Sequence, residues 1–209
     1  MTIEKGTFET KRALRFQTLS TEGPIEHLLF VLHGYGHLVE YFIKKFENSN
    51  LKNSLIIAPE GMHRFYLNGT SGRVGASWMT KEWREQDILE NTRTLSDFAK
   101  QFINHYPSAR VTVLGFSQGG ATAARWISEQ QITCDHFISW GSVFPPDISA
   151  EVLTKLNMKR SFVVGQQDTY FPETVLQDVL KQHQALGFEC ITFDGKHDIS
   201  LNTLEAILA

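Results

Sequence analysis

The chain has 209 residues, and its 20 Lys and Arg against 23 Asp and Glu leave a formal net charge of −3 at pH 7. This balance excludes the basic surface that a nucleic-acid-binding protein needs. No apolar run approaches the roughly 20 residues that span a bilayer, and the polar N-terminal segment lacks the apolar centre of a signal peptide. Two cysteines cannot build a disulfide framework. We therefore expect a cytoplasmic protein with no stable membrane anchoring and no nucleic-acid partner.

The predicted elements alternate between strand and helix along the chain. Short apolar runs that end at or near Gly or Pro are typical of strands buried on both faces, and apolar residues three and four apart are typical of helices. In chain order, the sequence predicts an antiparallel edge strand within residues 8–18, a strand at 28–32, a helix at 39–46, a strand at 55–58, a helix at 88–106, a strand at 111–114, a helical stretch through 121–124, strands at 136–140 and 161–164, a helix at 175–186, a strand at 190–193 and a helix at 201–208.

This alternation predicts an α/β fold built as a three-layer sandwich, with a mostly parallel central sheet covered by helices on both faces. With no internal repeat or linker, residues 1–209 are expected to form a single domain, and no insertion is long enough for a separate cap domain. The longest segment without periodicity, residues 59–83, follows a predicted strand end, where open α/β sheets bind ligands. We expect Trp78, Met79 and Trp83 in this segment to wall a substrate groove.

One motif in the sequence contains a candidate catalytic nucleophile. Gly115-Phe116-Ser117-Gln118-Gly119 lies between a predicted buried strand and a predicted helix. A Gly-x-Ser-x-Gly sequence in that context is the nucleophile elbow of α/β hydrolases, in which a tight turn exposes the serine hydroxyl above the sheet. Ser117 is therefore the candidate nucleophile.

A serine hydroxyl needs a base, and the base needs a carboxylate that fixes its tautomer. His197 lies between the last predicted strand and the last predicted helix, and Asp168 follows the preceding strand. Both should project from the same edge of the sheet as Ser117, in the chain order Ser, Asp, His expected of this fold. Asp194 and Asp198 are rival acids, which we disfavour because they lie too near His197 in the chain to support its ring.

Two backbone amides are expected to stabilise the tetrahedral oxyanion: the N–H of Gln118, directly after the nucleophile, and the N–H of Tyr35, in the loop after the first long strand. His33 and His37 have the spacing of a zinc pair, but they straddle a strand end and a loop. We therefore interpret His33 as a brace for the oxyanion loop and expect no metal site.

Taken together, these motifs resemble those of the phospholipase/carboxylesterase family, which includes the acyl-protein thioesterases. The resemblance extends from about residue 27 to the end of the chain and rests on His33-Gly34, the run from Gly115 to Gly120, Gly165-x-x-Asp168 with Pro172 beyond it, and Gly195-x-His197, with Ser77-Trp78 also similar. It implies a lidless hydrolase of carboxylic esters that needs no metal or organic cofactor. The sequence departs from the family at Tyr35-Gly36-His37, where thioesterases usually carry Leu-Gly-Asp, which puts an acyl-protein substrate in doubt.

The expected function is hydrolysis of small-molecule esters or thioesters of short to medium acyl chains through an acyl-enzyme. Two alternatives stay open: a non-catalytic small-molecule binding protein on the same scaffold, and a peptidase or acyltransferase of the same fold. The sequence also leaves open whether the protein forms a homodimer.

Overall fold

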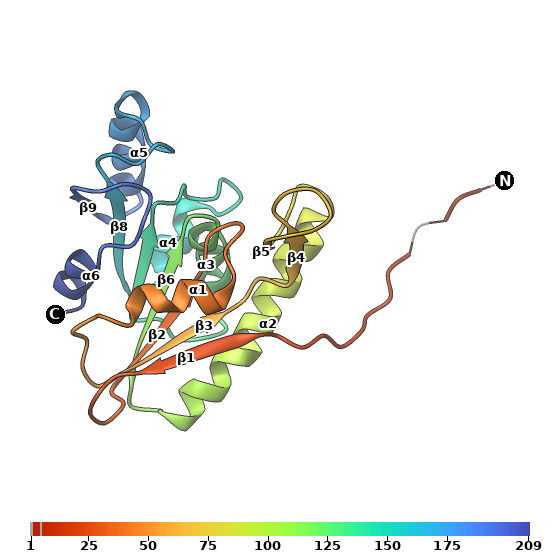
Figure 1. The fold of residues 1–209 in the computed structure, drawn as a ribbon. Coiled ribbons are helices and arrows are strands. Elements are labelled where there is room, and N and C mark those ends of the chain that lie inside the picture. Colours follow the sequence, from red (N-terminus) through yellow and green to blue (C-terminus); the bar gives the residue numbers. More distant parts are fainter. Residues whose placement is uncertain (1, 5) are drawn as a thin grey trace.

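The computed structural model describes residues 2–4 and 6–209, and its centre is a seven-stranded sheet of order β1-β3-β2-β6-β7-β8-β9 (Figure 1). Within this sheet, β1 pairs with β3 in the antiparallel direction, and the five other neighbouring pairs are parallel. The strands of this sheet are β1 (Phe16–Ser20), β2 (His27–Leu32), β3 (Ser54–Pro59), β6 (Arg110–Phe116), β7 (His136–Trp140), β8 (Lys159–Gly165) and β9 (Glu189–Phe193).

Helices connect the parallel strands and cover both faces of the sheet, which confirms the expected α/β-hydrolase fold of three layers (Figure 1). The helices are α1 (Val39–Phe42), α2 (Arg84–His105), α3 (Gln118–Ser128), α4 (Ala150–Lys155), α5 (Glu173–Ala185) and α6 (Leu201–Leu208), with the 3-10 helix η1 (Ile43–Phe46) directly after α1. The connection between β7 and β8 contains one helix, α4, of six residues, and it forms no cap domain.

The sheet is stable because its central strands are apolar on both faces. β2 and β3 are buried along their whole lengths. Alternate residues of β2 enter two separate cores: Leu28 and Phe30 belong to the core that also contains residues of α2, α3, α4 and α5, whereas Leu29 and Val31 belong to the core that contains residues of α1, η1 and α6. A strand covered on both faces must be apolar at every position, which is why these runs could be recognised in the sequence.

Two expectations about irregular segments need correction. The N-terminal edge strand begins only at Phe16, not within residues 8–15, because its partner β3 ends at Pro59, which pairs with Phe16. Residues 59–83 do not form one long loop: they contain a two-stranded antiparallel hairpin of β4 (His63–Tyr66) and β5 (Val74–Ser77). The hairpin lies beside the main sheet and turns through Gly69 and Gly72, both of which have positive φ (Figure 1).

No helix in the described part of the chain is both long and apolar enough to cross a membrane.

Candidate active site

Ser117 occupies the sharp turn between β6 and α3. Its φ of 54° and ψ of −120° lie outside the regions that a non-glycine residue usually adopts. Its N–H donates to the carbonyl of Trp140 at the end of the neighbouring strand, over 2.8 Å. The turn is so tight that it leaves no room for a side chain at Gly119, where a β-carbon would lie 2.3 Å from the carbonyl oxygen of Leu32. The surrounding strand ends therefore hold the serine in strained geometry, as expected for a nucleophile elbow.

Asp168 and His197 form a hydrogen-bonded pair at the same edge of the sheet. The distance from His197 Nδ1 to Asp168 Oδ2 is 2.6 Å. The other carboxylate oxygen of Asp168 accepts the N–H of Tyr170 over 2.9 Å. The Asp168 side chain is 1% exposed, whereas that of His197 is 18% exposed. The buried carboxylate thus fixes which imidazole nitrogen faces it and leaves Nε2 for a reacting group.

The two rival acids are engaged elsewhere. Asp194 accepts the side-chain amide of Gln167 at 2.7 Å. Asp198 forms an ion pair with Lys45 at 2.6 Å and accepts the N–H of Ile199. Asp168 is therefore the carboxylate that contacts His197.

Aromatic rings and one glycine bring His197 towards Ser117. The imidazole lies against Phe116, the residue before Ser117, with ring centroids 4.7 Å apart. On another side it packs against Tyr170 at 4.5 Å. Gly141 has a φ of 54°, and a β-carbon there would lie 3.1 Å from Cε1 of His197. No hydrogen bond joins Ser117 to His197 among the described residues; such nucleophile–base contacts are often looser before substrate binds.

The two residues whose amides are expected to stabilise an oxyanion belong to segments that lie next to Ser117. Gln118 is the first residue of α3 and its N–H is one of the amides that a helix leaves without an internal partner. Tyr35 follows Gly34, and a β-carbon on Gly34 would lie 3.1 Å from Cβ of Ser117. The Tyr35 side chain points away from this loop's interior: it is 57% exposed and packs against Phe65, with ring centroids 5.0 Å apart.

His33 is fully buried beneath this loop, and neighbouring backbone groups use both of its ring nitrogens. Nδ1 lies 2.8 Å from the carbonyl of Gly34, and Nε2 accepts the N–H of Gly61 at 2.9 Å. This pattern places the proton on Nδ1, and burial lowers the pKa of His33 to about 4. Among the described residues, no group of three His, Cys, Asp or Glu is arranged to hold a metal ion. His33 is a brace, which agrees with its interpretation from the sequence.

The side chain of Gln118 has a role that sequence reasoning missed. Its Oε1 accepts from Ser77 Oγ and from the N–H of Trp78, each at 3.1 Å, and its Nε2 donates to the carbonyl of Met79 at 2.9 Å. These bonds fasten the segment after the β4–β5 hairpin to the nucleophile elbow. No local pattern could have revealed them, because the partners lie about 40 positions apart in the chain.

The expected substrate-groove residues lie in three different environments. Trp78 is 1% exposed and belongs to the core, where its indole N–H donates to the carbonyl of His33 at 2.8 Å. The expectation that Trp78 walls a groove is wrong, because its side chain is buried beneath the oxyanion loop, where a backbone carbonyl accepts its N–H. Trp83 is 54% exposed and begins α2 with a φ of 54°.

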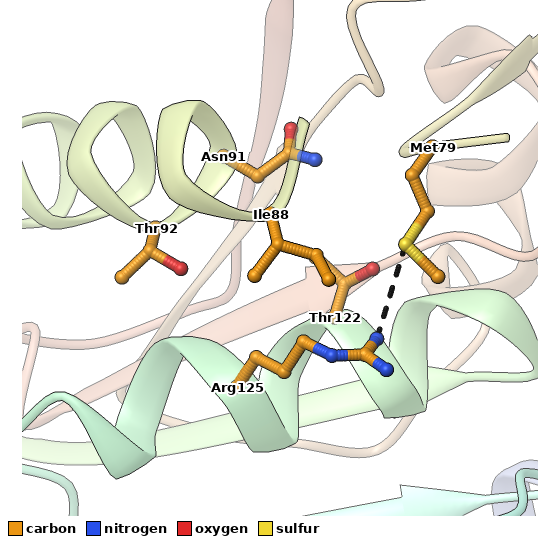
Figure 2. Close-up of a pocket in the computed structure, with 6 residues that line it drawn as sticks. All are labelled: Met79, Ile88, Asn91, Thr92, Thr122 and Arg125. Atoms are coloured by element: carbon orange, nitrogen blue, oxygen red, sulfur yellow. Dashed lines mark hydrogen bonds between the residues drawn. The ribbon is translucent and has the colours of Figure 1, made fainter. Parts of the chain in front are cut away.

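Met79 lines a small pocket between α2 and α3, and its expected role as a groove wall stays a prediction (Figure 2). The pocket has a volume of about 10 Å³, which is close to the space that one water molecule needs. The sulfur lies 4.0 Å from the guanidinium of Arg125, which is itself held by Asp147 at 2.7 Å. An acyl chain does not fit in this space.

Comparisons with known proteins agree with this architecture. A sequence model of the family described as Phospholipase/Carboxylesterase matches residues 15–208. Among proteins with curated descriptions, none is significantly similar in sequence.

Several solved structures share the fold at low sequence identity. The crystal structure of esterase PE8 is 19% identical, with a TM-score of 0.64 over 93% of this chain and 97% of that one. Acyl-protein thioesterase 2 from Zea mays is 15% identical, with a TM-score of 0.65 over 92% of this chain and 95% of that one. The protein Atu2452 from Agrobacterium tumefaciens, of unknown function, is 20% identical, with a TM-score of 0.60 over 91% and 92% of the two chains. At these identities the likeness establishes the fold alone.

Proposed function

Because the chain belongs to the phospholipase/carboxylesterase family of α/β hydrolases, we propose that it hydrolyses carboxylic esters or thioesters with Ser117 as the nucleophile. His197 is the general base in this proposal, and Asp168 orients it. The observation that carries the proposal is the 2.6 Å hydrogen bond between His197 and the buried Asp168, at the sheet edge where the strained Ser117 immediately precedes α3.

The proposed reaction has two halves. As Ser117 Oγ attacks the substrate carbonyl, Nε2 of His197 takes the hydroxyl proton, and the N–H groups of Gln118 and Tyr35 stabilise the oxyanion. The tetrahedral intermediate then collapses, the bond to the alcohol or thiol breaks, and His197 returns the proton to that leaving group. Water attacks the acyl-enzyme with the same base, which releases the carboxylic acid and restores the serine.

We further propose substrates with short to medium acyl chains. The chain between β7 and β8 holds only the six-residue helix α4, so no separate cap covers the carboxyl ends of the strands. An acyl chain in an open site gains about 0.8 kcal/mol for each CH₂ that it buries, and nothing for the part that extends into water. Selectivity should therefore rise and then level off as the chain lengthens.

The test compares ester, thioester and anilide substrates that carry the same butyryl group. We expect hydrolysis of the ester and the thioester, and a loss of about 10⁴–10⁶ in turnover for Ser117→Ala, as in other triad enzymes. Ser128→Ala in the same helix is the matched control, because its hydroxyl bonds only to the helix carbonyl of Ala124 at 2.7 Å. Retained activity in Ser117→Ala would contradict the proposal. Anilide cleavage as fast as ester cleavage would indicate a peptidase, and ester binding without turnover a binding protein.

A further inference from the structure

A large groove lies next to the candidate active site, between the segment after the oxyanion loop, α1 with η1, and the beginning of β5. Its volume is about 750 Å³, within the range of small-molecule sites. Its lining includes Gly36 and His37 from the segment after the oxyanion loop and Arg73 from the turn before β5. None of the residues that we expected to bind substrate lines this groove.

One residue that lines the groove, His37, packs against the same aromatic ring as the proposed catalytic base. His37 stacks on Phe116 with ring centroids 5.8 Å apart and an interplanar angle of 12°. Phe116 in turn lies against His197 at 4.7 Å. Backbone bonds fix His37 in place: the N–H of Gly36 donates to the carbonyl of Ala76, and the N–H of Ala76 donates to the carbonyl of His37. The single ring of Phe116 therefore separates His37, which lines the groove, from the proposed base His197.

The charge of the groove is positive. Three lining residues are cationic, Lys44, Lys45 and Arg73, and no Asp or Glu lines it. Asp198 neutralises Lys45 at 2.6 Å. Lys44 and Arg73 form no ion pair with any residue that the structure describes, although the whole chain carries a net charge of −3. Two cations that form no ion pair with a described residue thus line one groove of a protein with negative net charge, and Lys44 lies over the Tyr41 ring at 5.8 Å.

The remaining walls are suited to a ligand that is partly apolar. Leu38 and Val74 contribute aliphatic surface, and Tyr41, which is 63% exposed, contributes a phenol. Apolar walls with a few convergent polar groups are typical of sites for small organic molecules. The cations select for negative charge, because an oxyanion near them gains Coulomb energy and hydrogen bonds that a neutral group lacks.

We propose that this cationic groove binds an oxyanion, a carboxylate or a phosphate, carried by the ester substrate on its acyl or its alcohol part. The enzyme then prefers anionic esters to neutral esters of the same size. This inference rests on the proposed function, and it names the substrate class of that site.

The first test is a ratio of specificity constants. We compare kcat/KM for 4-nitrophenyl hydrogen glutarate, which is anionic, with that for 4-nitrophenyl hexanoate, which is neutral and of similar length. In a second pair of esters, the alcohol part carries the group that differs. It bears a phosphate in the anionic substrate and the neutral dimethyl ester of that phosphate in the other. At least one pair should favour the anion, and the double variant Lys44→Gln/Arg73→Gln should lower that ratio about five- to tenfold, the size expected of two partly exposed charge contacts.

The matched control removes one lysine and one arginine from the other face of the sheet, as Lys155→Gln/Arg93→Gln on α4 and α2. It has the same net charge, so a general electrostatic effect would lower the ratio equally in both variants. Addition of salt should weaken the anion preference of the native protein, because exposed charges are screened. A ratio that is the same in the native protein and in both variants would overturn the inference.

A binding measurement separates this inference from the proposed reaction. Ser117→Ala should bind the anionic ester more tightly than its neutral partner, and Lys44→Gln/Arg73→Gln added to it should remove the difference. If no substrate is hydrolysed but this difference is seen, the proposed function fails and the groove assignment stands. If neutral esters are hydrolysed and the difference is absent, the groove assignment fails and the proposed function stands.

Discussion

At the residue scale, the structure distinguishes between three aspartates that the sequence placed near His197. Asp194 and Asp198 are close to His197 in the chain, yet both side chains face other partners, Gln167 and Lys45. Asp168 is 29 positions away and contacts the imidazole, because parallel strands β8 and β9 end side by side. The alternation of elements predicts that such strands run parallel, and the strand order in the structure places β8 and β9 next to each other.

We predict that Asp168→Asn lowers kcat for ester hydrolysis by about 10⁴, since the amide favours the wrong imidazole tautomer while it preserves shape. Asp194→Asn and Asp198→Asn serve as controls and should each change kcat by less than about tenfold. Steady-state kinetics with a 4-nitrophenyl ester measures all three. A larger loss in either control than in Asp168→Asn would transfer the role to the loop that carries His197.

Trp78 shows where residue-level reasoning failed. The sequence places an aromatic residue in a glycine-rich segment near a strand end. Residues that line substrate pockets have the same sequence pattern. The structure buries it because its N–H reaches the carbonyl of His33, and its ring lies 5.0 Å from the His33 ring. A contact between residues 45 positions apart depends on the tertiary fold, so no local pattern could have predicted it.

At the element scale, the predictability of each strand follows from how apolar its sequence is. The six strands of the parallel part of the sheet are mostly apolar runs, and each was predicted within a few residues of its observed bounds. β4 alternates half-buried and exposed residues over only four positions, and β5 contains a glycine, so neither had a recognisable pattern. Their hairpin is instead held by long-range contacts, among them the bonds from Gln118 to the segment that follows β5.

We predict that Gln118→Leu destabilises the protein by about 1–3 kcal/mol, because it leaves the Trp78 N–H without its acceptor and removes one of the two donors to the Met79 carbonyl. Gln86→Leu on α2 is the control, since that exposed side chain bonds only to Glu90 and its loss should cost less than about 0.5 kcal/mol. Urea unfolding at equilibrium measures both. Equal stability of the two variants would show that Gln118 does not fasten this segment.

At the scale of the whole molecule, buried neutral histidines connect stability to pH. His27 bonds to Thr112 at 2.8 Å and His136 to Ser161 at 2.9 Å, at the end of the sheet away from Ser117, while His33 lies beneath the oxyanion loop. Burial lowers the pKa of each of the three histidines from 6.5 to about 4. The folded protein therefore excludes protons that the unfolded chain accepts below pH 6.5.

We predict that the free energy of unfolding changes little from pH 8 to 7 and falls as the pH drops below 6.5 towards 4. Each histidine contributes a slope of up to about 1.4 kcal/mol per pH unit, so the three together reach about 4 kcal/mol per unit. Urea unfolding at several pH values measures the slope, and His136→Gln should reduce it by about one third. A stability that is independent of pH between 6.5 and 5 would contradict the burial of neutral imidazoles.

The central claim, that Ser117 is a nucleophile activated by His197, is tested most directly by covalent labelling with a fluorophosphonate probe, followed by intact-mass analysis and peptide mapping. The account predicts one adduct per chain, on the peptide that contains Ser117. The adduct should be absent in Ser117→Ala and should form far more slowly in His197→Ala. An adduct on a different serine, or ester hydrolysis by a protein that the probe does not label, would contradict it.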